Sequence, residues 1–140
     1  MHHAFEGQPE VPISRAVRAG SLVFTSAYGP WTFDPTKVVH DAMGRVASDG
    51  SGLEGTPFEE QVHRSFGFVA GALGAAGCDL ADVVRMECWI ADPRDFVAFN
   101  QVYATYFPHR RPVRSVFPSA FLFACKVEMQ ATAWRPTAGA

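Results

Sequence analysis

The sequence predicts a single α+β domain in which two helices pack on one face of a mixed β-sheet. Its 140 residues suffice for one domain, and 48% of them are hydrophobic against 19% charged, so a sizeable core can be buried. Segments follow one another in the order strands, helix, strand, helix, strands. Each helical segment carries one apolar stripe, and one sheet face can bury both stripes. We expect residues 1–10 to form a flexible tail and residues 11–136 to form the domain.

Two short strands joined by a turn are predicted near the N-terminus, at residues 16–18 and 22–26. Val23 and Phe24 favour extended structure because branched and aromatic side chains fit a pleated surface. Gly20 lies between the two segments and suits a tight turn. The first part of the sheet is therefore expected here.

The next segment, Trp31–Gly55, is long, irregular and rich in Gly, Asp and Ser. Only Lys37–His40 within it resembles a strand. Loops of this length are uncommon inside compact domains and often have a function. The segment is either a surface excursion or a flap over a site, and both interpretations stay open.

The first helix is predicted to begin near Thr56, with Thr56 as the N-cap, Pro57 at the first helical position and Glu59 completing a capping box. Gly77 is a natural stop at the other end. An apolar stripe recurs at helical spacing in Val62, Phe66, Val69, Leu73 and Ala76. Glycines elsewhere on this helix each cost about 1 kcal/mol relative to alanine. Close packing against a sheet would be a reason to keep them, and they are Gly67, Gly71 and Gly74.

The second half of the chain continues the alternation. Val83–Ile90 is predicted to be a strand, and one of its two faces carries Val84, Met86, Cys88 and Ile90. Asp92 caps a second helix and Pro93 occupies its first position. The aromatic residues of that helix recur at helical spacing, as Phe96, Phe99, Tyr103 and Tyr106. Residues 113–117 and a stretch within 121–134 complete the sheet.

The composition argues against several classes of protein. A formal net charge of -2 disfavours a dedicated nucleic-acid binder, which would carry a basic face. The longest uncharged helical stretch is too short to cross a bilayer, and the N-terminus has no apolar signal segment. The three cysteines lack paired spacing, which indicates reduced thiols and a cytoplasmic location. The aromatic excess, 12 Phe and 3 Trp, suggests that part of it is buried between subunits.

Arg114 is the first candidate for chemistry. It follows Pro112 and begins an apolar strand. An arginine at the mouth of a sheet can bind a carboxylate through two parallel hydrogen bonds. The alternative is an ordinary surface arginine beside Arg110 and Arg111.

Glu128 and Ser26 are further candidates. Glu128 lies in mid-strand on the more polar face, where a carboxylate could orient a water or move a proton. The alternative is a solvated face on which Glu128 pairs with Lys126. Ser26 ends an apolar strand, so its hydroxyl could bind a ligand, but no motif places it in a catalytic triad. The histidines show no ligand spacing, so no metal is expected, and no Gly-rich phosphate loop is present.

Taken in order, these segments resemble the Rid (YjgF-like) family over residues 11–134. The most specific match is residues 111–115, Arg-Pro-Val-Arg-Ser, which resemble the family's P-x-R-[ST] signature. Residues 20–27 resemble the early strand that usually ends in Ser-Gly, and residues 126–131 resemble the closing strand. The resemblance implies the chorismate-mutase-like fold of this family, assembled as a homotrimer with clefts between subunits.

Active members of this family hydrolyse reactive enamines and imines derived from amino acids, such as 2-aminoacrylate, to 2-keto acids and ammonia. By resemblance, Arg114 would hold the substrate carboxylate, Glu128 would help to place the attacking water, and Ser26 would line the pocket. The imine is already electrophilic, so the protein mainly positions water and substrate, and no cofactor is implied. The expected partners are a small carboxylate substrate and further copies of the chain.

Two substitutions depart from the family pattern. Ile13 stands where the family's Pro-Tyr-Ser motif has tyrosine, and Val116 stands where deaminating members often carry cysteine. Both residues are expected to line the substrate pocket and to make it more apolar. The changes leave open a deaminase for a bulkier, aminomuconate-like substrate and a non-catalytic protein that binds small carboxylates. A ribonuclease role is disfavoured by the net charge.

Overall fold

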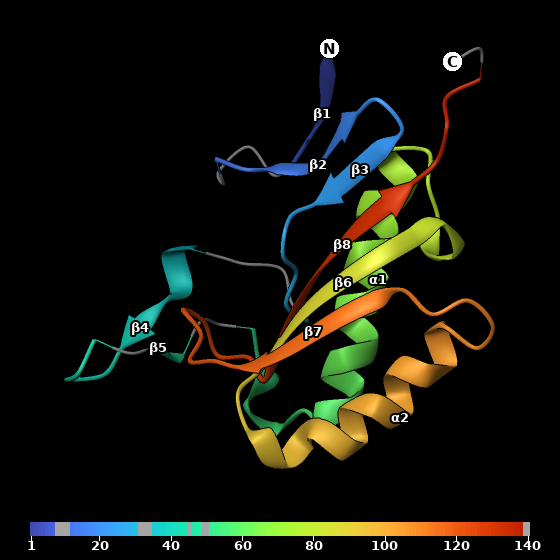
Figure 1. The fold of residues 1–140 in the computed structure, drawn as a ribbon. Coiled ribbons are helices and arrows are strands. Elements are labelled where there is room, and N and C mark those ends of the chain that lie inside the picture. Colours follow the sequence, from blue (N-terminus) through green and yellow to red (C-terminus); the bar gives the residue numbers. More distant parts are fainter. Residues whose placement is uncertain (8–11, 31–34, 45, 49–50, 139–140) are drawn as a thin grey trace.

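The main strands form one mixed sheet in the order β1-β2-β3-β8-β6-β7 (Figure 1). The structure is a computed structural model that describes residues 1–7, 12–30, 35–44, 46–48 and 51–138. Strands β6 and β7 run parallel, and the other neighbouring strands run antiparallel. The strands are β1 (His2–Glu6), β2 (Ser14–Ala19), β3 (Leu22–Thr25), β6 (Val83–Ile90), β7 (Val113–Pro118) and β8 (Val127–Trp134).

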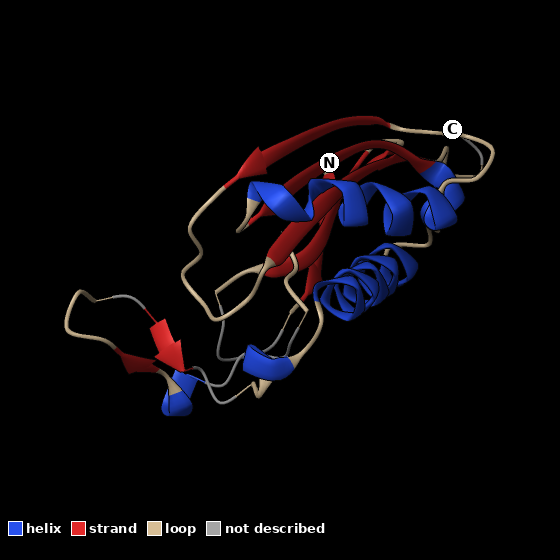
Figure 2. Ribbon diagram, turned by 90° about the horizontal axis from the view of Figure 1, so that it is seen from below, coloured by secondary structure: helices blue, strands red, loops and turns tan. Residues whose placement is uncertain are grey.

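Helices α1 (Phe58–Ala75) and α2 (Phe96–Tyr106) lie side by side on one face of this sheet (Figure 2). The predicted α+β class, with two helices on one face of a mixed sheet, is confirmed. Within the described ranges, neither helix is long and apolar enough to cross a membrane. Among the helices that the structure describes, neither α1 nor α2 covers the other face of the sheet (Figure 2).

The expectation of a tail over residues 1–10 does not hold for His2–Glu6, which form β1 antiparallel to β2. The polar composition of this stretch hides the strand, because edge pairing uses backbone groups and requires no apolar side chain. Phe5 nevertheless packs against the core. Residues 8–10 of the expected tail and Val11, the expected start of the domain, lie outside the described residues.

The start of α1 differs from the prediction. Pro57 is the N-cap residue, with an extended ψ of 148°, and no side chain caps the helix. Thr56 is therefore not the cap. Its backbone carbonyl instead accepts a hydrogen bond from the side-chain amide of Gln61. Acidic side chains in the first turn, Glu59 and Glu60, complement the positive end of the helix dipole.

The end of α1 matches the prediction. Gly77 has a φ of 74°, which favours glycine. The amide of Cys78 donates to the carbonyl of Leu73 at 2.9 Å, and that of Gly77 donates to Gly74 at 3.0 Å. These two bonds form a Schellman motif, which satisfies carbonyls that the helix leaves unpaired.

The predicted apolar stripe of α1 is buried, from Val62 to Ala76. The glycines of α1 are exposed, so packing against the sheet is not what keeps them. A Cβ at Gly67 or Gly74 would meet nothing within 4 Å. One at Gly71 would meet only the end of the Arg15 side chain, at 3.4 Å. The structure gives no reason for glycine at positions 67 and 74.

Strand β6 is confirmed, but its first residues exchange faces. Val83 is buried and Val84 is 44% exposed, although Val84 was expected to share the face of Met86. The pairing with β8 shifts register between Val83 and Arg85. A bulge of this kind adds a residue to one strand, so the alternation is reset there.

The remaining elements follow the sequence closely. A short 3-10 turn, η4 (Pro93–Asp95), leads into α2, and the Asp92 carboxylate accepts from the amide of Arg94 at 2.9 Å. Strand β8 alternates between buried and partly buried residues along most of its length. Strand β7 lies at the edge of the sheet.

The long loop holds a separate two-stranded sheet. It contains η1 (Pro35–Lys37), β4 (Val39–His40), β5 (Val46–Ser48) and η2 (Leu53–Gly55). Figure 1 shows β4 and β5 away from the main sheet. The strand expected at residues 37–40 is thus found at its last two residues. Residues 31–34, 45 and 49–50 lie outside the described residues, and a flap role stays a prediction.

Gln61 connects this loop to the rest of the domain. Its side chain is 1% exposed. The amide nitrogen donates to the carbonyls of Thr56 at 3.1 Å and Leu53 at 3.5 Å, and the amide oxygen accepts from the backbone of Lys126 at 3.0 Å. One buried amide therefore joins the end of the long loop to the residue that precedes β8.

We expect Gln61→Leu to lower the free energy of unfolding by about 2–3 kcal/mol. The reason is that the backbone carbonyl of Thr56 and the backbone amide of Lys126 lose the hydrogen-bond partner that Gln61 provides. Urea denaturation measures the change. The matched control is Gln101→Leu on the exposed side of α2. Equal stability of the two variants would contradict the proposed role of Gln61.

Candidate functional site

The side chain of Arg114 faces the helices. Arg114 is opposite Met86 in the parallel pair of β7 and β6, and Met86 is fully buried. Paired residues on neighbouring strands share a face. The guanidinium carbon lies 4.6 Å from the ring centroid of Tyr103 and 5.6 Å from that of Phe99, both on α2. Arg114 forms no hydrogen bond or ion pair with the residues that the structure describes.

The groups around this guanidinium are uncharged. Burial raises the pKa of the Tyr103 hydroxyl far above its usual range, and the Arg114 charge lowers it only in part. Burial likewise raises the pKa of Cys88 to about 12. Both groups therefore keep their protons at neutral pH. The positive charge of Arg114 is not neutralised by either of them.

Val116 lies on the same face of β7 as Arg114. It is opposite the buried Cys88 and packs, partly buried, against the core. The branched side chain thus fills space between β7 and the helices. These two candidate residues form one group on the helix side of the sheet.

Glu128 lies on the other face. It is opposite Trp89 and alternates with the buried Val127 and Met129. The thiol of Cys125 donates to its carboxylate at 3.9 Å. Burial raises the pKa of Glu128, and the Cys125 hydrogen bond lowers it in part. The carboxyl group is therefore less acidic than an exposed glutamate.

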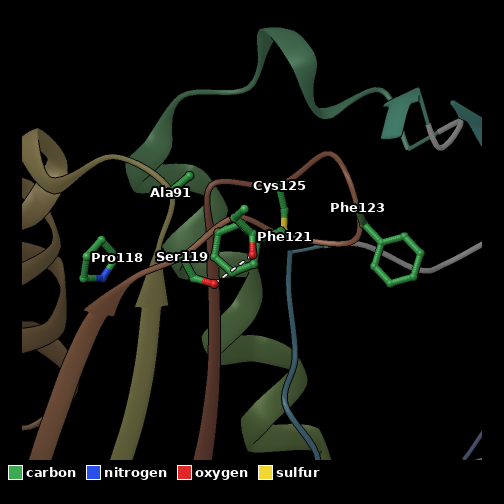
Figure 3. A pocket seen from close by; sticks show the side chains of 7 residues that line it. Ala91, Pro118, Ser119, Phe121, Phe123 and Cys125 are labelled. Carbon is green, nitrogen blue, oxygen red and sulfur yellow. Dashed lines mark hydrogen bonds between the residues drawn. The ribbon is translucent and has the colours of Figure 1, made fainter. Parts of the chain in front are cut away.

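An open, mostly apolar pocket adjoins Glu128 through Cys125 (Figure 3). It has a volume of about 470 Å³ and lies where β6 ends and the β7–β8 loop passes. Its lining consists of Ala91, Pro118, Ser119, Ala120, Phe121, Phe123 and Cys125. The pocket could accept an apolar group of a ligand whose polar end lies at the Glu128 carboxylate.

Ser26 and Ile13 lie further along the sheet. The Ser26 hydroxyl donates to the carbonyl of Ser14 at 2.7 Å, which leaves its oxygen able to accept a hydrogen bond. Ile13 precedes β2 and is 51% exposed. Strands lie about 4.8 Å apart, so β3 and β7, with two strands between them, are separated by roughly 14 Å.

One chain therefore does not bring the predicted residues together. Arg114 and Val116 face the helices, whereas Glu128 faces away from them. Sequence reasoning did not identify Tyr103 or Cys125 as site residues. The alternation of β7 could have placed Arg114 with Val116, but no sequence signal indicated the ring that the guanidinium contacts. Among the described residues, no group of three or more His, Cys, Asp or Glu side chains could hold a metal.

Comparison with known proteins identifies the family. A family model described as endoribonuclease L-PSP matches residues 3–135. The chain belongs to this family, which is the YjgF or Rid family that the sequence resembles.

The similar proteins include named deaminases. A mouse protein named 2-iminobutanoate/2-iminopropanoate deaminase is 33% identical over 115 residues, which cover 77% of this chain and 83% of the mouse protein. An Arabidopsis thaliana protein named Reactive Intermediate Deaminase A is 30% identical over 125 residues. That match covers 87% of this chain but 58% of the plant protein, less than two thirds of its length.

Solved structures support the fold. A member of the YjgF/YER057c/UK114 family from Mycobacterium tuberculosis superimposes with a TM-score of 0.71 at 26% identity. The match covers 96% of this chain and 99% of that protein.

The raised pKa of Glu128 predicts a pH-dependent stability. A carboxyl that binds its proton more tightly in the folded chain destabilises the fold as the pH rises from the ordinary pKa through the raised one. Glu128→Gln is neutral throughout. We therefore expect the stability of this variant, relative to the wild type, to increase as the pH rises from about 4, near the ordinary glutamate pKa, toward neutrality.

Urea denaturation across this pH range measures the difference. Glu6→Gln, which removes an exposed carboxyl from β1, is the matched control for the loss of one charge. A difference that stays flat would show that folding leaves this pKa unshifted, and a difference that falls would show that the carboxylate is stabilised in the folded protein.

Proposed function

We propose that this protein is an enamine/imine deaminase that hydrolyses 2-aminoacrylate-type enamines and 2-imino acids to 2-keto acids and ammonia. The observation that carries the proposal is the Arg114 guanidinium, whose donors are unpaired within the described chain. Its position in the family signature and the names of the similar deaminases support the same function. Ribonuclease activity is not proposed, because a net charge of -2 disfavours binding to RNA.

Arg114 would bind the carboxylate of the substrate. A guanidinium presents N–H donors in a planar fork that matches a carboxylate, and two parallel bonds fix both position and direction. The neutral side chains of Tyr103 and Cys88 leave this charge available to the ligand. The carbon–nitrogen double bond next to the carboxylate is thereby held in one orientation.

Glu128 would direct the water. A carboxylate of raised pKa can accept a proton from water while the oxygen adds to the imine carbon. The imine reacts as its protonated form, so the addition gives a carbon that bears both a hydroxyl and an amino group. Glu128 then passes its proton to the nitrogen and takes the hydroxyl proton as the carbon–nitrogen bond breaks, which releases ammonia and leaves the 2-keto acid. The ammonia finally takes the proton from Glu128 as ammonium. Atoms and charges balance without a cofactor, and the protein contributes mainly by positioning.

The two halves of this site would come from different chains of a homotrimer. Arg114 and Glu128 lie on opposite faces of one sheet, so a single substrate cannot reach both within one chain. Strand β7 offers an open edge for contact with a neighbour. The helix-free face also carries exposed apolar side chains that an assembly would bury, namely Leu22, Phe24, Val113, Phe117 and Trp134.

We expect Arg114→Ala to lower kcat/KM for imine hydrolysis by more than about a hundredfold, because one charge-assisted bidentate contact is worth on the order of 3 kcal/mol. The assay measures 2-keto acid released from an imine generated in place by an amino acid oxidase. Arg111→Ala removes an exposed arginine from the same segment and is the matched control.

Equal rates for Arg114→Ala and the wild type would end the proposal. Calorimetry detects a third outcome, in which the protein binds a ligand without catalysis. If the wild type binds a 2-keto acid but turns over no imine, the protein is the carboxylate-binding homologue that the sequence left open.

A mixture of two inactive variants tests the shared site. We expect Arg114→Ala and Glu128→Gln chains, refolded together, to recover roughly a quarter of the wild-type activity, since that fraction of clefts combines an intact Arg114 with an intact Glu128. Each variant refolded alone is the control, and sedimentation reports the assembly. No recovery from the mixture, or a monomer in sedimentation, would rule out a site between chains.

A bulkier substrate is a second candidate within the same reaction. The apolar pocket of about 470 Å³ beside Cys125 favours it, because a three-carbon imine would leave that space empty. Val116 and Ile13, in place of the family's cysteine and tyrosine, make the site less polar in the same direction.

For this candidate, we expect kcat/KM to rise from imines derived from alanine to those from leucine and phenylalanine. Ala91→Phe adds a ring to the pocket wall and should lower the phenylalanine-to-alanine ratio of kcat/KM by about tenfold. The same oxidase-coupled assay serves. A preference of the wild type for the smallest imine would exclude the bulkier substrate.

A further inference from the structure

Among the described residues, the guanidinium of Arg114 contacts aromatic rings and no hydrogen-bond acceptor. Three rings of α2 surround its carbon, with centroids at 4.6 Å for Tyr103, 5.6 Å for Phe99 and 5.9 Å for Phe96. Within the described part of the chain, no carboxylate or carbonyl accepts from the guanidinium. The direction of its donors therefore depends on aromatic faces, with which a planar cation interacts favourably.

Tyr103 is the nearest of these rings, and it is buried in the core. It is 7% exposed, whereas Phe96 is 41% exposed. Its ring contacts Phe107 at 4.9 Å, Phe99 at 5.7 Å and Phe66 at 5.9 Å between centroids. The core of the domain thus sets the plane of the Tyr103 ring, and the ring in turn limits where the guanidinium can lie.

The hydroxyl of Tyr103 takes no part in this contact. It is buried and makes no hydrogen bond with the residues that the structure describes. A hydroxyl in that position cannot reach a ligand without a rearrangement of the packing around it. What Tyr103 supplies to Arg114 is therefore its aromatic face, which phenylalanine would supply as well.

We propose that Tyr103 is a positioning residue whose ring, and not its hydroxyl, holds the Arg114 guanidinium in the orientation that binds the substrate carboxylate. The inference rests on the proposed function for its substrate. The geometric part, in which the ring orients the arginine, stands without any turnover. The two parts can therefore be tested separately.

Three variants give the kinetic test. We expect Tyr103→Leu to raise KM for a 2-imino acid by about tenfold and to change kcat by less than about threefold, because the ring acts on carboxylate binding. Tyr103→Phe restores the ring and should return KM to within about threefold of the wild type. Phe107→Leu removes a buried ring that contacts Tyr103 but not Arg114, and it is the matched control for lost packing.

Nuclear magnetic resonance gives a readout that needs no substrate. The Nε–H signal of Arg114, assigned by its loss in Arg114→Lys, should be displaced by the ring current of Tyr103. The displacement should persist in Tyr103→Phe and Phe107→Leu and become clearly smaller in Tyr103→Leu, where the more distant rings of Phe99 and Phe96 remain. If Tyr103→Leu does not fold, Tyr103→Met fills more of the same volume and takes its place.

Several outcomes overturn the proposal. These are an unchanged Arg114 signal and KM in Tyr103→Leu, equal impairment by the Phe and Leu variants, or the same effect from Phe107→Leu. A wild type that hydrolyses no imine refutes the proposed function, and the Arg114 signal then decides the positioning by itself.

Discussion

The burial of one sheet face beneath α1 and α2 is the interaction on which the rest of the structure depends. The stripe of α1 from Val62 to Leu73 and alternate residues of β6 and β8 form one core that is closed to solvent. Successive residues of a strand point to opposite faces, so covering one face commits every strand residue to the core or to the open side. Arg114 and Glu128 are placed on opposite sides by this rule.

Each side of the sheet therefore carries half of a candidate site. On the helix side, an arginine lies against aromatic rings, with neutral groups around it. On the open side, Glu128 of raised pKa adjoins an apolar pocket. In the proposed deaminase, a second copy would complete what the first one lacks. The open edge of β7 and the apolar open face are the features that such an assembly would use.

The departures from the family pattern have different surroundings in the structure. Val116 packs against the core, so a cysteine there would meet the helices in a single chain. Ile13 is half-exposed, so its apolar side chain is available to a ligand or to a neighbouring chain. Ile13 in place of the family tyrosine therefore changes the surface that a ligand or a neighbouring chain can contact. Val116 instead changes the packing on the side of the sheet where Arg114 lies.

The sequence by itself determined the elements and their order, because these depend on neighbouring residues. Asp92 and Pro93 begin a helix through local hydrogen bonding, and β8 alternates as its residue types require. Short sequence motifs likewise indicated membership of the family. Only the tertiary structure decided that His2–Glu6 pair with β2, that Val83 and Val84 exchange faces, and that Arg114 lies against Tyr103. These outcomes depend on backbone pairing and packing between segments far apart in the chain, and local propensity carries no information about either.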